Sequence, residues 1–166
     1  MGRDNDPGVL SVRKGFALGN ADVKRIPRFS QDAEDGHNLV KVARATFDPS
    51  ANTGERTVAA HGLGVFIPDN AIILGGFYDV ITTFTSAADT ATIALSTEGA
   101  NDIVAAVAIG TGTPFDAGRR DIVPDGTGLN SVKMDTAAGN EIVATVAVQA
   151  LTAGKMHIYL VYMTGE

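Results

Sequence analysis

Segments in which apolar and polar residues alternate recur from about residue 39 to the end of the chain. In Glu141–Ala150, every second residue is apolar and the intervening positions are more polar. The apolar positions are Ile142, Ala144, Val146 and Val148. A period of two places successive side chains on opposite faces of an extended backbone, so the pattern indicates a half-buried β-strand. The many alanines do not favour helices here, because they stand among Val, Ile and Thr in short runs.

The same pattern predicts eight strands, separated by clusters of Gly, Asp, Asn, Ser and Pro that are typical of turns. The predicted strands are Leu39–Phe47, Val58–Phe66, Ala71–Thr85, Thr90–Ser96, Ile103–Ile109, Ser131–Met134, Glu141–Ala150 and Lys155–Met163. Paired glycines inside a strand indicate a bulge or a corner. Gly75 and Gly76 therefore predict either a bulge in the third run or a division of that run into two strands.

Two further segments allow more than one interpretation. Asn101–Ile109 is interpreted as a strand, but it also fits a short helix that Asn101 or Asp102 caps and Gly110 ends. Met156–Met163 is apolar on both faces apart from His157, which alternates with Tyr159 and is expected on a sheet face. Such a run suits a central strand that is covered on both sides, or one whose second face a neighbouring subunit covers.

Eight short antiparallel strands predict an all-β fold, an antiparallel β-sandwich with a jelly-roll-like topology. A length of 166 residues suits one domain with a tail, and we place the boundary near residue 38. Residues 1–37 contain Pro7, Pro27 and scattered apolar residues without a period of 2 or 3.6. We therefore predict an extended N-terminal arm over residues 1–37 and a β-sandwich domain over residues 38–166.

The charge of the chain is unevenly distributed. Residues 1–40 carry six basic and six acidic side chains, so the net charge of −6 lies entirely in residues 41–166. An acidic domain repels phosphate backbones, which argues against nucleic-acid binding. Five basic residues lie close together in the predicted arm: Arg13, Lys14, Lys24, Arg25 and Arg28. This basic cluster either docks on an acidic protein surface, which makes these residues candidate contacts, or belongs to a solvated tail.

The sequence contains no catalytic or metal-binding pattern. It has no cysteine, which excludes disulfides and thiolate chemistry, and no apolar run near the ~20 residues that a membrane-spanning helix needs. His37, His61 and His157 lack the spacing of metal ligands, and Asp32, Glu34 and Asp35 lack the pattern of a calcium loop. No serine elbow, P-loop or dinucleotide fingerprint is present. We therefore predict a protein that is not an enzyme and uses no cofactor or metal.

Several phrases of the sequence resemble those of one group of viral proteins. They are GVFIPDNAIILGGFYDVITTFTSAADTATIALS, NDIVAAVAI, PFDAG and IVATVAVQALTAGKMHIYLVYM, which lie between Gly64 and Met163. This part is similar to the head decoration, or capsid cement, proteins of tailed bacteriophages and to related minor structural proteins of the virion. The first 40 residues lie outside the resemblance.

The resemblance implies a β-sandwich on the outer surface of the capsid that clamps subunits of the major capsid protein. It also implies a homo-oligomer, with a trimer favoured, that is made in the host cytoplasm. Ile158, Leu160 and Tyr162 would then form an apolar face that packs against a sister subunit. The alternative is that these three residues line the inside of one sandwich.

Two other functions remain open on the sequence. A receptor- or glycan-binding module of a phage fibre or spike fits a jelly roll, although the chain contains no Trp and three Tyr. A small enzyme of the cupin kind would need a cluster of His and carboxylate ligands on neighbouring strands. Three isolated histidines argue against that enzyme.

Overall fold

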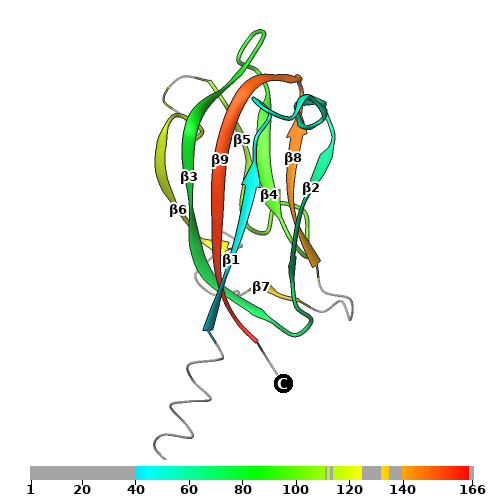
Figure 1. Ribbon diagram of the computed structural model, residues 1–166, viewed down its shortest axis with the longest axis vertical. Coiled ribbons are helices and arrows are strands. Elements are labelled where there is room, and N and C mark those ends of the chain that lie inside the picture. Colours follow the sequence, from blue (N-terminus) through cyan, green and yellow to red (C-terminus); the bar gives the residue numbers. More distant parts are fainter. Residues whose placement is uncertain (1–39, 111, 113, 125–131, 135–139, 165–166) are drawn as a thin grey trace, which may run out of the picture. The chain divides into compact units, whose positions relative to one another are not determined.

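The strands form two antiparallel sheets in a computed structural model that describes residues 40–110, 112, 114–124, 132–134 and 140–164 (Figure 1). The chain divides into two units, Met1–Asn38 and Leu39–Glu166. The predicted arm, residues 1–37, lies outside the described residues and stays a prediction. The elements are β1 (Val40–Phe47), the 3-10 turn η2 (Thr53–Arg56), β2 (Ala60–Ile67), β3 (Ile72–Ser86), β4 (Thr92–Ser96), β5 (Val104–Ala108), β6 (Gly118–Ile122), β7 (Val132–Lys133), β8 (Asn140–Ala147) and β9 (Leu151–Met163).

The two sheets have the topology of a jelly roll. One sheet has the order β1-β9-β3-β6, with β7 paired to β3, and the other has the order β2-β8-β4-β5. The pairs β1–β9, β2–β8, β3–β6 and β4–β5 are nested, as in one long antiparallel hairpin. Successive pairs of this hairpin fall alternately in the two sheets, which is the winding of a jelly roll. The predicted all-β, jelly-roll-like sandwich is confirmed.

The core lies between the two sheets and is built from every second residue of the strands. Ile142, Ala144 and Val146 of β8 are buried, as the alternating pattern predicted. Buried residues of β9 alternate with partly exposed ones, so Met156 and Ile158 face inward. Because an extended strand sends successive side chains to opposite sides, one register determines both the core and the outer surface.

All eight predicted strands overlap a strand of the structure, although several bounds differ; β9, for example, begins at Leu151 rather than Lys155. Asn101–Ile109 contains β5, so the helical alternative is wrong. β3 is one strand, and the predicted irregularity at Gly75 and Gly76 is a register shift between Ile73 and Gly75. β6 was not predicted, because its sequence GRRDI has three consecutive charged residues and no apolar alternation.

The predicted strand Glu141–Ala150 ends three residues early, in a tight turn. Val148 has φ 68, and the Gln149 N–H donates to the Ala147 carbonyl at 2.8 Å, which closes a three-residue turn. Positive φ is unfavourable for a β-branched residue, so the turn needs support from its surroundings. The side-chain oxygen of Gln149 accepts hydrogen bonds from Ser86 Oγ at 2.7 Å and from the Ala88 N–H at 2.9 Å. These bonds tie the β8–β9 turn to the loop after β3.

Three phenylalanine rings pack together in the core, and one of them lies against a glycine. Phe84 stacks on Phe47 with ring centroids 5.7 Å apart and meets Phe115 edge-on at 5.9 Å. Gly154 of β9 has φ 145, and a Cβ added there would collide with the Phe84 ring. The absence of a side chain at Gly154 is therefore what lets the Phe84 ring lie against β9.

We expect Gly154→Ala to lower the free energy of unfolding by about 3 kcal/mol, because it strains the backbone and displaces the buried Phe84 ring. Urea denaturation followed by far-UV circular dichroism measures the change. Gly99→Ala is the matched control, since an added Cβ there meets no atom within 4 Å. Equal stability of the two variants would show that Phe84 can shift at no cost.

Candidate functional site

The described residues form no metal-binding cluster, so the candidate sites among them are interaction surfaces. No group of three or more His, Asp or Glu among them could hold a metal ion. The described part of the chain also contains no helix long and apolar enough to cross a membrane. The ring of His61 bonds the Thr57 carbonyl at 2.8 Å and stacks on Phe47, so its role is structural. His37 and the acidic residues Asp32, Glu34 and Asp35 lie outside the described residues.

A pocket of about 290 Å³ opens between β5 and β6. Its walls include Tyr78, Ile103, Val104, Pro114 and Ile122. Burial raises the pKa of the Tyr78 hydroxyl, partly offset by the nearby positive charge of Arg120. The volume is at the lower limit of ordinary ligand pockets, and no metal-binding cluster of described residues lies there, since Asp121 is the one carboxylate among its lining residues. The pocket therefore gives no support to a catalytic role.

The basic residues of the domain gather in the five-stranded sheet. Every Lys or Arg that lies in a described strand belongs to this sheet: Lys41, Arg44, Arg119, Arg120, Lys133 and Lys155. The strands of the other sheet, β2, β4, β5 and β8, contain none, and their single charged residue is Glu141. In a chain of net charge −6, the five-stranded sheet is thus the surface best suited to an acidic partner.

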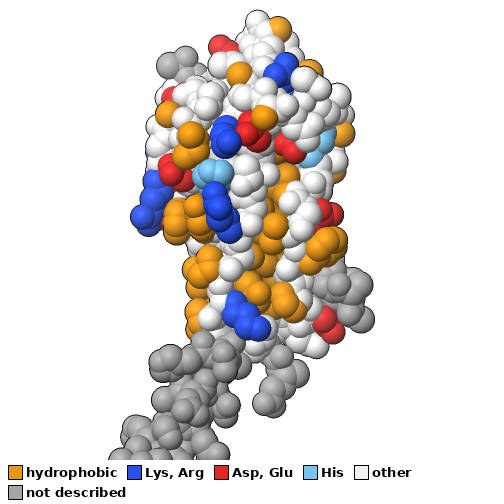
Figure 2. Space-filling model, viewed as in Figure 1, with side chains coloured by type: hydrophobic (Ala, Val, Ile, Leu, Met, Phe, Trp, Pro, Cys, Tyr) orange, Lys and Arg blue, Asp and Glu red, His pale blue; other side chains and the backbone are white. Residues whose placement is uncertain are grey.

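The outer face of the five-stranded sheet, called the sheet face below, carries two rows of side chains that cross four strands. The first row is Arg44, Tyr159, Phe77 and Asp121, and the second is Thr46, His157, Asp79 and Arg119. Residues directly opposite on adjacent antiparallel strands lie within contact distance of each other. Figure 2 shows basic, hydrophobic and histidine side chains together on this face.

The two aromatic rings of the first row stack on each other, and a guanidinium group lies over each ring. One guanidinium group comes from the first row and the other from the second row. Phe77 and Tyr159 have centroids 4.6 Å apart and planes inclined by 19°. Arg119 Cζ lies 4.3 Å from the Phe77 centroid, and Arg44 Cζ lies 5.8 Å from the Tyr159 centroid. Cations attract the faces of aromatic rings, with about 0.5–1 kcal/mol for each exposed pair. The stack therefore holds two positively charged groups in fixed positions on the sheet.

His157 lies at the centre of the second row, where its contacts favour the neutral form. Its Nε2 lies 3.4 Å from Arg44 Nη2 and its Nδ1 lies 2.9 Å from Thr46 Oγ1. Because arginine only donates, Nε2 must accept, and Nδ1 carries the proton that Thr46 accepts. Burial, with the positive charges of Arg44 and Lys155, lowers the pKa of His157 below its ordinary value of 6.5. Asp79 and Asp48 oppose this shift.

Large apolar side chains surround the two rows. Four of the exposed large hydrophobic residues lie on strands of this sheet: Val40, Val42, Leu74 and Ile81. Val42 is 61% exposed and lies opposite Val161, next to the row that contains Arg44. Arginine, aromatic and apolar residues are the types enriched where proteins bind one another. The sheet face is therefore the candidate interaction surface of the described domain.

The structure corrects one predicted site. Ile158 and Leu160 are fully buried and Tyr162 is 9% exposed, so the three residues lie inside the sandwich. Buried side chains cannot contact a sister subunit, and the alternative interpretation, the inside of one sandwich, describes their position. The other face of β9, which carries His157 and Tyr159, is the accessible one, as was predicted for His157. The basic cluster Arg13, Lys14, Lys24, Arg25 and Arg28 lies outside the described residues and stays a prediction.

Comparisons with known proteins connect the fold with bacteriophage capsids. No family model matches the chain, and no curated protein matches it in sequence. A chain of the acidic stable capsid structure of Helicobacter pylori bacteriophage KHP30 is similar, with a TM-score of 0.54 and 13% identity over 77% of this chain and 90% of that chain. A chain of the cyanophage Pam1 capsid asymmetric unit has a TM-score of 0.56 and 18% identity, over 76% and 85% of the two chains. A chain of the capsid of Ralstonia phage GP4 has a TM-score of 0.51 and 19% identity, over 76% and 86%.

At these identities the likeness establishes the fold. The matched region covers most of each capsid chain, so the likeness extends to nearly the whole of each neighbour rather than to one motif. Functional residues cannot be carried over from it, and the function rests on further argument.

We expect His157→Gln to make stability less dependent on pH. A lowered pKa means that the folded chain binds fewer protons than the unfolded chain below about pH 6.5. The free energy of unfolding of the wild type should therefore be greatest above that pH and decrease as the pH falls through the folded pKa. Urea denaturation at pH 7.5, 6.5 and 5.5 should show a smaller decrease for the variant. An identical decrease in both proteins would contradict the assignment.

Proposed function

We propose that this protein is a non-enzymatic structural component of a bacteriophage virion that binds the outer surface of the capsid and stabilises the head shell. The observation that carries the proposal is the likeness of its sandwich to chains of three phage capsids, over 85–90% of their length. The likeness supports a place in a capsid. The resemblance of the sequence to head decoration proteins supports the more specific role of a cement protein.

The sheet face supplies a physical basis for attachment. It combines the apolar residues Val42 and Ile81 with the fixed guanidinium groups of Arg44 and Arg119. We assign the contact with the major capsid protein to this face, together with the basic cluster of the predicted arm. Many copies on one symmetric lattice each add modest contacts, and linked contacts act at a high effective concentration. Such binding can restrain shell subunits without one very tight site.

A homo-oligomer, with a trimer favoured, is part of the proposal. Three copies around one symmetry axis would join neighbouring capsid subunits through closed, repeated contacts. The contact between copies does not use Ile158, Leu160 or Tyr162, since these residues are buried within each sandwich. Sedimentation of the purified protein measures the number of copies, and a monomer at all concentrations would contradict this part.

We expect the purified protein to bind undecorated capsids of its phage saturably and to raise the temperature at which the shells break open. Sedimentation with shells measures the binding, and electron microscopy of the particles locates the added density. Absence of both saturable binding and a gain in heat resistance would contradict the proposal. Specific binding on a glycan array would instead favour a receptor- or glycan-binding module.

We expect deletion of residues 1–37 to weaken attachment to the shells while the sandwich stays folded. The reason is that an arm contributes contact area and the basic residues Arg13, Lys14, Lys24, Arg25 and Arg28. Circular dichroism and thermal denaturation of the truncated chain check the fold. Unchanged affinity would show that the arm plays no part in attachment.

A further inference from the structure

The lateral edges of the two sheets are strands β1 and β6 in one sheet and β2 and β5 in the other. An edge strand presents N–H and C=O groups to which a strand of another chain can add. Proteins usually obstruct such edges with bulges, short strands or consecutive charges. The four edges of this sandwich differ in this respect.

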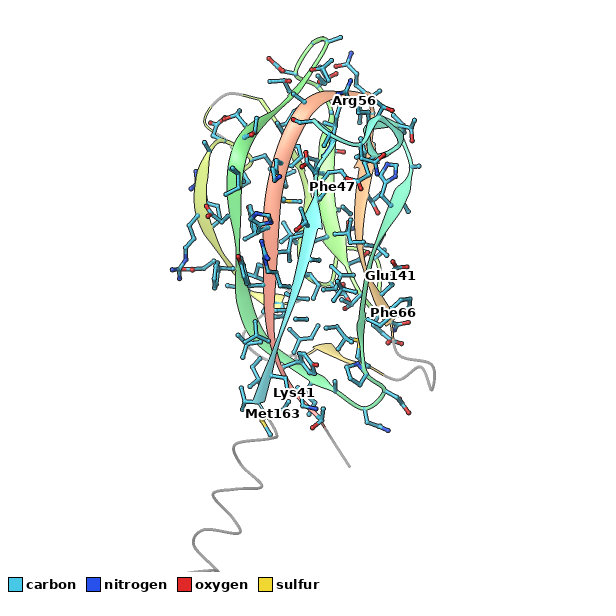
Figure 3. The ribbon with its side chains drawn as sticks, viewed as in Figure 1. Lys41, Phe47, Arg56, Phe66, Glu141 and Met163 are labelled. Atoms are coloured by element: carbon cyan, nitrogen blue, oxygen red, sulfur yellow. The ribbon has the colours of Figure 1, made fainter. Side chains whose placement is uncertain are left out.

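Three edges carry an obstruction. In β2 the register shifts between Gly62 and Phe66, and the Gly64 N–H already donates to the Glu141 carboxylate at 2.5 Å. Figure 3 labels Phe66 and Glu141 on these two strands. β5 has five residues, and its pairing with β4 is interrupted by a register shift. β6 also has five residues, and the three consecutive charged residues of its sequence GRRDI interrupt an apolar edge. Strand addition is disfavoured at each of these edges.

β1 carries no such obstruction. Its eight residues, VKVARATF, pair with β9 from Val40 to Phe47 without a register shift, and they include neither Gly nor Pro. Val40 and Val42 are 48% and 61% exposed. No second strand pairs with β1 among the described residues. β1 is therefore the longest regular open edge in this part of the chain, and its residues favour the extended conformation.

The charges of β1 indicate what can pair with it. Two other basic residues of the sheet have carboxylate partners: Lys155 Nζ lies 2.8 Å from Asp48, and Arg119 Nη2 lies 3.6 Å from Asp121. Among the described residues, neither Lys41 nor Arg44 forms an ion pair, and the guanidinium group of Arg44 contacts His157 and Tyr159 of β9. Lys41, at the end of β1 (Figure 3), thus has no ion-pair partner among the described residues and can pair with an added strand, whereas the Arg44 guanidinium group lies toward β9 and adds positive charge behind the edge.

A second copy of β1 does not satisfy these charges. Antiparallel pairing of two β1 strands would bring four cations into one short ribbon without a carboxylate of β1 to offset them, and their mutual repulsion disfavours that pairing. An extended segment with carboxylates near Lys41 and Arg44 and apolar residues near Val42 would match both the charge and the apolar positions of the edge.

We propose that the open edge of β1 binds an extended acidic segment of the major capsid protein by β-strand addition. This inference rests on the proposed function, because it takes the capsid as the partner. Main-chain hydrogen bonds would supply affinity, and Lys41, Val42 and Arg44 would select the segment. The added strand would extend the five-stranded sheet and lie beside the apolar residues of the sheet face.

The test compares single charge reversals in the full chain for binding to undecorated shells. Arg44→Glu and Lys41→Glu should each weaken binding by tenfold or more. Lys41→Glu is the cleaner variant, because Lys41 has no side-chain hydrogen bond or ion pair within the described residues, whereas Arg44 contacts His157 and Tyr159. Arg120→Glu is the matched control: it makes the same change of charge on β6, at the opposite edge of the same sheet, and should bind within twofold of the wild type. Thermal denaturation checks that each variant folds.

Hydrogen–deuterium exchange distinguishes strand addition from a contact through side chains alone. The amides of residues 40–47 should exchange at least tenfold more slowly when the wild type is on the shell. Wild-type binding with unchanged exchange in β1, or with full affinity for Lys41→Glu, would overturn the inference and leave the proposed function intact. Slower exchange in β1 on self-association without shells would identify a second copy as the occupant and also overturn it. Failure of the wild type to bind shells at any salt concentration would overturn both the strand addition and the proposed function.

Discussion

The antiparallel pairing of β3 with β9 is the contact on which the sandwich depends. β9 has a strand on each side along most of its length, with β1 opposite Met156–Met163 and β3 opposite Leu151–Met163. β3 pairs with β9 on one side and with β6 on the other. Its register with β9 shifts at four places, and such irregularities let a strand bend around the core. Gly76 permits the close approach, since a Cβ there would collide with the Tyr159 carbonyl.

The same pairing creates the candidate site. Met156 and Ile158 enter the core only if His157 and Tyr159 point outward, and the β3 register then sets Phe77 beside Tyr159 and Asp79 beside His157. A slip of one residue would exchange the two faces of β9 and would bury a histidine and a lysine without partners. The register that the core requires therefore also determines which outward-facing positions lie side by side on the sheet face.

The sequence was sufficient for the fold because alternation reports which segments bury one face. Alternation fails where that signal is weak. GRRDI contains no apolar alternation, so β6 was missed. Both faces of Met156–Met163 are apolar, so the sequence left open whether Ile158, Leu160 and Tyr162 face a sister subunit or the inside of one sandwich. The candidate site could not be found this way. Arg44 and His157 are 113 positions apart, and they meet only through the pairing of β1 with β9.

An open, regular edge strand carries a risk of aggregation, so its retention in β1 needs a physical reason. Lys41 and Arg44 lower that risk, because they repel another β1 strand while leaving the backbone groups accessible. The same two charges attract a carboxylate-bearing segment, so one pair of residues both disfavours self-association and favours a particular kind of partner. Arg44 is suited to this role because the Tyr159 ring and His157 hold its guanidinium group in place, which reduces the entropy lost on binding. The aromatic stack and the open edge thus act together as one binding surface.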